Sequence, residues 1–174
     1  DRDYTVRLRA QAMAAQSGTT TPVPLGRVET RRPFTFYQDA ARDEMAAPAR
    51  TLRLDTTRGV LDVELATADA ILTARHLARL ASEGYFDGLT FHRVVPAFVA
   101  QGGDPRGDGW GGPGEAIRCE INRLRYARGA AGMALSGKDT GGSQFFFTLT
   151  DQPHLDGGYT VFGRLSPASL AVVD

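Results

Sequence analysis

An arginine and a glutamine interrupt the apolar, aromatic-rich run FHRVVPAFVAQGGDP at residues 91–105. Alternation predicts a strand at the start of this run, with Phe91, Arg93 and Val95 on one face. An arginine on a covered face costs free energy unless something accepts its hydrogen bonds. Because Arg93 stays charged and presents several donors in a fixed geometry, we expect it to donate to a ligand or to a neighbouring side chain.

Phosphate binding, metal chemistry and nucleophilic catalysis find little support in the sequence. The glycine-rich segment at residues 103–114 lacks the Lys-Ser/Thr pair and the strand-to-helix context of a phosphate loop, which favours an ordered surface loop. Its Arg-Gly-Asp tripeptide is interpreted as a chance occurrence. Ser136 and Ser143 do not lie in a nucleophile elbow. The three histidines and the one cysteine lack metal-ligand spacing.

Two of the histidines are assigned roles outside catalysis. His76 falls within a helical pattern, where solvent exposure is the expectation. His92 alternates away from Arg93, which favours a structural role over a catalytic one.

The composition restricts the partners of the chain. Basic residues (Lys and Arg) and acidic residues (Asp and Glu) number 20 each, so no net field favours nucleic acid or an anionic membrane surface. A chain of 174 residues with 42% hydrophobic residues can form the core of one domain with an appended segment. The apolar stretches are strand-length, which predicts no membrane span. Cys119 has no partner for an internal disulfide, so cytoplasmic, periplasmic and cell-envelope locations all stay open.

Short alternating segments dominate the chain after residue 50. Residues 51–65 predict two strands with Gly59 near their turn, and residues 68–84 predict an amphipathic helix that ends at Gly84. The apolar face of this helix consists of Ala70, Ala74, Leu77, Ala78 and Ala81. Further strands are expected at residues 89–95, 98–101, 130–135, 144–149 and 159–165. A second helix is expected to begin at Pro167. Many short strands and few helices predict a mostly β fold, a closed antiparallel barrel.

The first 49 residues are interpreted as an N-terminal extension and linker. Residues 1–17 are rich in Ala and Arg and predict a helix, although a strand at residues 4–10 also fits. This segment resembles part of a HEAT-type helical repeat. The two prolines within residues 18–26 favour an extended linker. Three aromatic residues are expected to dock on another part of the protein: Phe34, Phe36 and Tyr37.

Three sequence blocks follow one another in the second half of the chain. They are FHRVVPAFVAQGGDP at residues 91–105, GMALSGKDTGGSQFFFTL at residues 132–149 and HLDGGYTVFG at residues 154–163. In composition, order and spacing they resemble signature blocks of the cyclophilin family of peptidyl-prolyl isomerases, and the resemblance covers residues 50–174. It implies a cyclophilin-like β-barrel with two flanking helices. The family has eight strands, and the last is expected to be absent here, which would leave an unpaired edge.

The resemblance implies a site around Arg93. In the family the matching arginine faces the substrate at the edge of a proline pocket, so Arg93 is the implied catalytic cation. Gln101 is implied to orient it and to hydrogen-bond the substrate backbone. The implied wall of the proline pocket consists of Phe98, Met133, Phe146 and Leu155, with Val99 beside it. The residue before proline is implied to contact Ala134 and Leu135, and a close approach of the substrate backbone is implied at Gly109 and Gly142.

The implied reaction is rotation about X-Pro bonds in proline-containing peptides and in unfolded or folding proteins. It needs no cofactor, metal, nucleotide or general base. The alternative is a proline-peptide binding module that recruits partners without turnover. Arg93 favours the enzyme, because binding alone does not require the cation. Since the sequence begins with Asp1 and ends at Asp174 without a terminating signal, we expect a piece of a longer protein.

Three positions depart from the commonest family pattern. His154 stands where many members carry a tryptophan that contacts the drug cyclosporin. Tyr159 stands where a histidine is frequent, a change similar to bacterial members, and Leu135 replaces an asparagine. None of these removes the arginine, so activity is expected, with weak binding of cyclosporin-type ligands.

Overall fold

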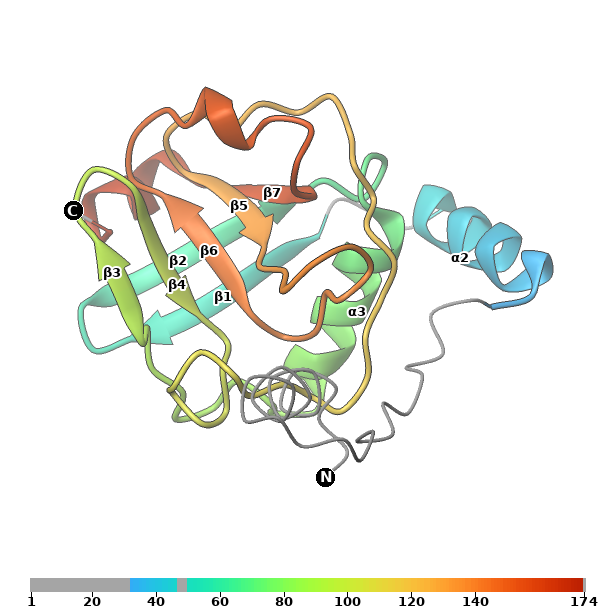
Figure 1. Cartoon of the computed structure of the whole chain (residues 1–174), viewed down its shortest axis with the longest axis horizontal. Helices are drawn as coiled ribbons and strands as arrows, with labels where there is room; N and C mark the ends of the chain where they lie inside the picture. The colour runs from blue at the N-terminus through green and yellow to red at the C-terminus, as the bar shows by residue number, and fades with distance from the viewer. Residues whose placement is uncertain (1–31, 47–49, 174) are drawn as a thin grey trace, which may run out of the picture.

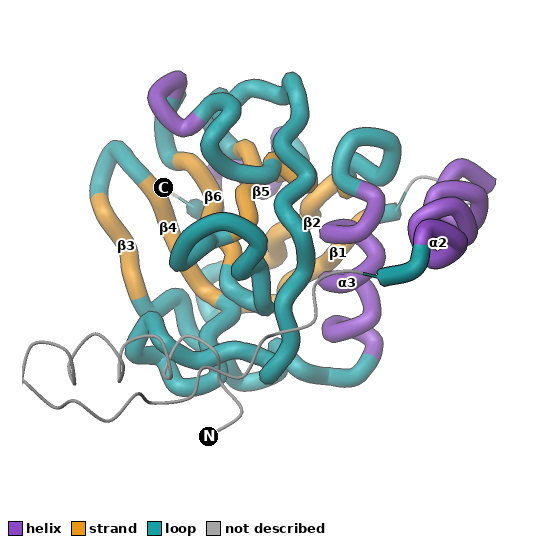
Figure 2. Tube along the Cα trace, turned by 45° about the vertical axis from the view of Figure 1, so that its right-hand side comes forward, coloured by secondary structure: helices purple, strands orange, loops and turns teal. Residues whose placement is uncertain are grey.

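Seven strands form one curled antiparallel sheet, with α3 packed against it and α2 outside α3 (Figures 1 and 2). The computed structural model describes residues 32–46 and 50–173. Along the sheet the strands lie in the order β1-β2-β7-β5-β6-β4-β3. Their bounds are β1 Thr51–Thr56, β2 Gly59–Leu65, β3 Arg93–Val95, β4 Val99–Gly102, β5 Ala130–Met133, β6 Phe145–Thr148 and β7 Val161–Leu165. The helices are α2 Phe34–Ala46 and α3 Ile71–Ser82, with two 3₁₀-helices, η1 Pro153–Leu155 and η2 Pro167–Ala171.

The prediction of a mostly β fold made of short antiparallel strands, with an unpaired edge where the last strand of the family is absent, is confirmed. Every strand pair in the described chain is antiparallel. β1 and β3 stand at the two ends of the strand order and do not pair with each other in residues 50–173. The sheet is therefore a curled half-barrel and not a closed barrel.

The elements differ from the predicted ones mainly at their ends. α3 lies inside the predicted helix, and Gly84 follows its end with a φ of +70°, a left-handed conformation that favours glycine. The strand expected at residues 89–95 begins only at Arg93, because turns occupy residues 83–88 and no ladder forms before Arg93. The helix expected from Pro167 is a short 3₁₀-helix.

Two apolar clusters lie on opposite faces of the central strands. In β6, Phe145 and Phe147 belong to the inner cluster, which joins the sheet to Ala74 and Leu77 of α3. Phe146, between them in sequence, belongs to the outer cluster. Successive side chains of a strand point to opposite faces, so one phenylalanine triplet serves both clusters. The outer cluster consists of Val99, Tyr126, Ala130, Phe146, Leu155 and Val161, with Phe98, Leu124, Ala134 and Tyr159 packed against it.

The aromatic residues of α2 do not dock as expected. Phe34 is 74% exposed and Phe36 is 43% exposed, so the prediction is wrong for both. Tyr37 does make a contact, because the guanidinium carbon of Arg118 lies 5.9 Å from its ring centroid. α2 is held to α3 by other means, including buried Ala40 and an ion pair of 3.0 Å between Asp43 and Arg75.

The helix, strand and repeat interpretations of residues 1–17, and the linker at 18–26, lie outside the described residues. Within residues 32–46 and 50–173, no helix combines the length and the apolar character needed to cross a bilayer.

Candidate active site

A row of side chains crosses the sheet from its β3 edge. Arg93 of β3 is the register partner of Gln101 of β4, and Gln101 is in turn the partner of Phe146 of β6. Directly opposed residues of antiparallel strands point to the same face. The local alternation therefore places the cation, the amide and the aromatic ring side by side on the outer face.

Arg93 is exposed and has two contacts with predicted site residues. Its Nη1 donates to Oε1 of Gln101 at 3.2 Å, and its guanidinium carbon lies 5.7 Å from the ring centroid of Phe98. The contact with Phe98 is a cation–π arrangement, which holds the guanidinium near an apolar surface. The outer face thus carries a charged donor at the border of an aromatic wall.

Gln144 continues the hydrogen-bond chain, and the sequence analysis did not single it out. Nε2 of Gln101 donates to Oε1 of Gln144 at 3.0 Å, and Nε2 of Gln144 donates to the carbonyl oxygen of Gly111 at 2.9 Å. The signal was present in the Gly-Ser-Gln-Phe-Phe part of the second block, which places Gln144 two residues before Phe146.

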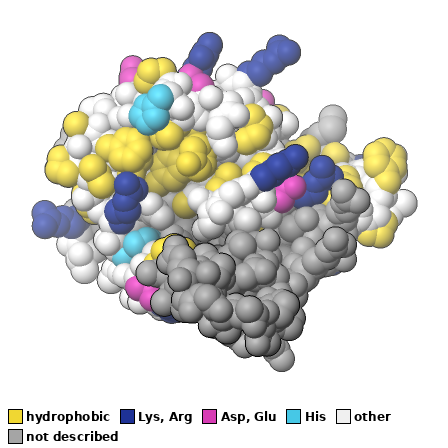
Figure 3. Space-filling view, in the orientation of Figure 1, with side chains coloured by type: hydrophobic (Ala, Val, Ile, Leu, Met, Phe, Trp, Pro, Cys, Tyr) yellow, Lys and Arg dark blue, Asp and Glu magenta, His cyan; other side chains and the backbone are white. Residues whose placement is uncertain are grey.

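Aromatic rings build the wall beside this chain. Phe146 stacks on Tyr126 with ring centroids 5.5 Å apart and meets the Tyr159 ring edge-on at 6.0 Å. Phe98 stacks on His154 at 5.8 Å, and Leu155 belongs to the same outer cluster. In Figure 3, hydrophobic side chains gather on this face, with basic and histidine side chains at their border.

Val99 and Met133 are the most deeply buried of the predicted pocket residues. Val99 is buried in the outer cluster, on the same face as Gln101, and lies beneath the aromatic wall. Met133 is not brought to this wall. It pairs with Phe145, is only 1% exposed and packs in the inner cluster on the other face of the sheet.

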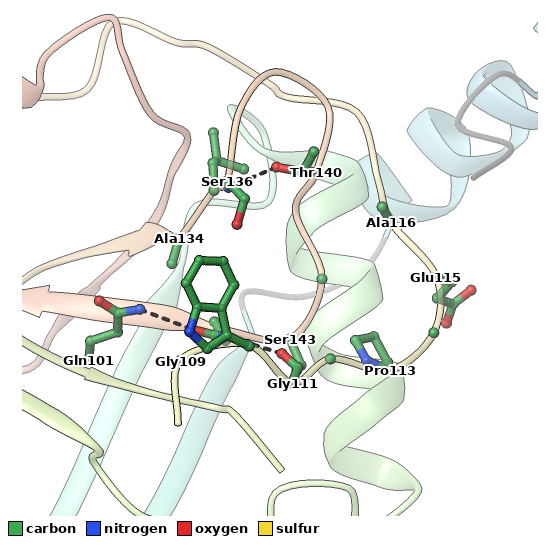
Figure 4. Close-up of a pocket in the computed structure, with 16 residues that line it drawn as sticks. Gln101, Gly109, Gly111, Pro113, Glu115, Ala116, Ala134, Ser136, Thr140 and Ser143 are labelled. Carbon is green, nitrogen blue, oxygen red and sulfur yellow. Dashed lines mark hydrogen bonds between the residues drawn. The ribbon is translucent and has the colours of Figure 1, made fainter. Parts of the chain in front are cut away.

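A cavity of about 160 Å³ opens next to Gln101. Its lining includes Gly109, Ala134, Leu135 and Gln144 (Figure 4). The cavity thus brings together the predicted contacts of the residue before proline. Its remaining walls are residues 110–116 on one side, and Ser136, Thr140, Gly142 and Ser143 on the other.

The glycine-rich segment is held by a buried carboxylate. Asp104 accepts hydrogen bonds from the backbone N–H groups of Arg106 and Gly109, and it is 1% exposed. Gly109 has a φ of +85°, a conformation that side chains rarely adopt. A Cβ at Gly111 would collide with the Asp104 carboxylate. The glycines therefore serve loop geometry, as the surface-loop interpretation expects.

The histidines are more enclosed than expected. His76 is only 7% exposed, so the expectation of solvent exposure is wrong. Its Nε2 lies 2.9 Å from the carbonyl oxygen of Gly142. His92 is partly buried, and neither ring nitrogen has a hydrogen-bond partner within the described residues. Burial also raises the pKa of the Tyr126 hydroxyl far above its usual value, so the ring in the wall stays neutral.

Known proteins share this fold and these segments. The family model described as cyclophilin type peptidyl-prolyl cis-trans isomerase/CLD matches residues 51–174. A protein of Helicobacter pylori named peptidyl-prolyl cis-trans isomerase is 46% identical over 145 residues, a match that covers 82% of this chain and 88% of that protein. Peptidyl-prolyl cis-trans isomerase B of Bacillus subtilis is 52% identical over 108 residues, covering 61% of this chain and 76% of its own.

A solved structure agrees with these sequence matches. The cyclophilin type peptidyl-prolyl cis-trans isomerase of Cryptosporidium parvum, crystallised in the presence of the dipeptide Ala-Pro, is similar with a TM-score of 0.66 and 34% identity. That match covers 71% of this chain and 84% of the solved one. The chain belongs to the cyclophilin family of peptidyl-prolyl cis-trans isomerases, and its activity is rotation about the X-Pro peptide bond.

Proposed function

We propose that Arg93 is the catalytic group of this isomerase and that it acts by stabilising the twisted X-Pro bond. The observation that carries the proposal is the position of an exposed guanidinium between the Gln101 amide and the Phe98 ring. No lysine or arginine is among the residues that line the adjoining cavity in the described part of the chain.

The chemistry needs a donor and no base. Rotation about a peptide bond is opposed by resonance, with a barrier of about 18–20 kcal/mol. Uncatalysed X-Pro isomerisation takes tens of seconds or longer. Twisting removes the conjugation and leaves a lone pair on the prolyl nitrogen. Arg93 donates to that nitrogen or to the neighbouring carbonyl more strongly in the twisted state than in either planar state, and this difference accelerates the reaction.

Gln101 and Gln144 orient the donor. Oε1 of Gln101 accepts from Arg93, while its Nε2 is occupied by Gln144. A guanidinium held by a fixed acceptor loses less rotational freedom when it meets the substrate. Gln101 also lies at the cavity, where it can hydrogen-bond the substrate backbone.

The proline ring binds on the aromatic wall. Phe98 and Phe146 supply the apolar surface, Leu155 the floor, and His154 and Tyr159 the rim. Val99 supports these rings from below. An apolar wall holds the ring still while the other side of the bond turns, and it reduces competition from water for the Arg93 donors.

The segment before proline enters the neighbouring cavity. Ala134 packs against the aromatic wall and also lines the cavity, so it stands where the two meet. The small residues there, including Gly109, leave space for a peptide backbone. The substrates are accessible X-Pro segments of unfolded or folding proteins, which is in keeping with the Ala-Pro dipeptide used with the related Cryptosporidium protein.

A protease-coupled assay on an X-Pro peptide tests the role of Arg93. Arg93→Ala is expected to lower kcat/KM by about a hundredfold or more, the cost of losing one preorganised donor. Because the side chain is exposed, the variant should unfold at nearly the wild-type denaturant concentration. Arg164→Ala, which removes an exposed arginine of β7, is the matched control. Wild-type turnover in Arg93→Ala would refute the assignment.

A further inference from the structure

A buried histidine ties α3 to the segment that carries Gln144. His76 is 7% exposed, and its Nε2 lies 2.9 Å from the carbonyl oxygen of Gly142. A carbonyl oxygen only accepts, so Nε2 carries the proton and donates. The contact joins residues 66 positions apart in the sequence.

The ring of His76 is neutral at neutral pH. Burial lowers its pKa below the usual value, and this outweighs the opposing effect of the Gly142 carbonyl. The charged groups around the ring are Arg79 of α3, Glu83 directly after α3, and Glu115 of the loop after β4. Arg79 forms ion pairs with both glutamates, so part of the negative charge near the ring is neutralised within this cluster.

Gly142 lies in a stretch whose neighbours are fixed separately. The carbonyl of Gly141 accepts from the N–H of Ile117 at 2.7 Å, and the buried Ser143 hydroxyl donates to the carbonyl of Gly103 at 2.6 Å. His76 supplies the hydrogen bond to the carbonyl between them. Gly142 and Gln144 both line the cavity.

We propose that His76 is a positioning residue for the isomerase reaction, because it holds the 142–144 segment in the place where Gln144 can fix Gln101 against Arg93. The inference rests on the proposed roles of Arg93 and Gln101. His76 touches neither the substrate wall nor Arg93. It acts through one carbonyl, and the hydrogen-bond chain from Gln144 to Gln101 transmits the effect.

Protonation of His76 at acid pH should weaken this positioning. As the pH falls below about 6.5, the unfolded chain takes up a proton at His76 before the folded chain does. Stability therefore falls as the pH drops from that value toward the lower folded pKa. Turnover of the folded enzyme falls only when the pH passes the folded pKa itself, because the buried ring then becomes charged and the 142–144 segment must move to solvate it.

Two substitutions separate positioning from packing. His76→Gln keeps an N–H donor of similar reach that does not titrate, and it should keep kcat/KM close to the wild-type value. His76→Leu fills the space but leaves the Gly142 carbonyl without its donor, and it should lower kcat/KM by about tenfold. Leu77→Ala is the matched control, because it removes buried packing from the same helix without touching Gly142. All assays are run well below the unfolding temperature of each variant.

The pH profile is the second readout. As the pH falls below about 6.5, wild-type kcat/KM should show an acid limb that His76→Gln lacks. Full activity of His76→Leu, equal losses in His76→Gln and His76→Leu, or the same acid limb in His76→Gln would each overturn the inference. Arg93→Ala measured in parallel keeps the two ideas distinct, since its full activity would refute the role of Arg93 whatever His76 does.

Discussion

Nη1 of Arg93 donates to Oε1 of Gln101 at 3.2 Å, and the two residues face each other across β3 and β4. The orientation of the Gln101 amide, which presents its oxygen to Arg93, is set from the other end of the hydrogen-bond chain. The Gly111 carbonyl can only accept, so it fixes which end of the Gln144 amide faces it. Oε1 of Gln144 then accepts a hydrogen bond from Nε2 of Gln101. This leaves Oε1 of Gln101 to accept from Arg93.

Gln101→Leu should lower kcat/KM by about tenfold, because the guanidinium loses the acceptor that orients it. The main effect is expected in kcat, since Arg93 itself remains. Gln38→Leu, an exposed glutamine of α2, is the control for the change in side-chain type. Steady-state kinetics on an X-Pro peptide measure both. Unchanged kcat in Gln101→Leu would show that Arg93 needs no orienting acceptor.

Phe146→Ala should weaken peptide binding and turnover together, because the proline ring contacts this wall in both ground and transition states. The ring is only 6% exposed and stacks on Tyr126, so the free energy of unfolding should also fall by roughly 3 kcal/mol. Urea denaturation and peptide titration measure the two effects. Phe146→Leu should retain more of both, and wild-type affinity in the alanine variant would exclude Phe146 from the proline wall.

His154→Trp should tighten inhibition by cyclosporin while changing peptide turnover only modestly. His154 is exposed at the rim, where it stacks on Phe98. A tryptophan offers a larger apolar face and an indole N–H donor to a large, rigid ligand. Titration of the drug against both proteins, with isomerase activity as the signal, measures the change. Tight inhibition of the unsubstituted protein would show that the rim residue matters little.

Glu120→Ala should lower the free energy of unfolding by about 2 kcal/mol. Ala70, the N-cap of α3, provides no side-chain cap. The Glu120 carboxylate caps the helix from another segment, since it accepts hydrogen bonds from the backbone N–H groups of Leu72 and Thr73 at 2.9 and 2.7 Å. Its negative charge also suits a helix N-terminus. Thermal or urea unfolding measures the change, and Glu64→Ala, which removes an exposed glutamate of β2, is the control. Equal stability of the Glu120→Ala and Glu64→Ala variants would contradict the prediction.

Much of the fold was predictable because strands leave a local signal. The alternation around Phe146 and the row from Arg93 to Gln101 depend on neighbouring residues and on strand pairing, so pattern and motif spacing anticipate both. The open edge was expected from the absent last strand of the family pattern. Which strands end the sheet was not predictable, because that depends on contacts across the whole chain.

The remaining errors have the same physical origin. A helical pattern records which residues are apolar, so it places His76 on the surface, whereas its carbonyl partner lies 66 residues further along the chain. Met133 belongs to the second sequence block, but the strand alternation turns its side chain to the inner face, beside Phe145. Phe34 and Phe36 show that aromatic composition alone does not specify burial.

The account depends most on the claim that Arg93 stabilises the twisted bond and not the bound peptide. NMR exchange spectroscopy on a saturating Ala-Pro peptide measures the rotation rate. The fluorescence of Trp110, the one tryptophan of the chain and part of the cavity lining, measures the peptide Kd. For Arg93→Ala the account predicts that the rate falls by about a hundredfold or more, with a Kd near the wild-type value. An unchanged rate, or a Kd weakened as much as the rate falls, would contradict it.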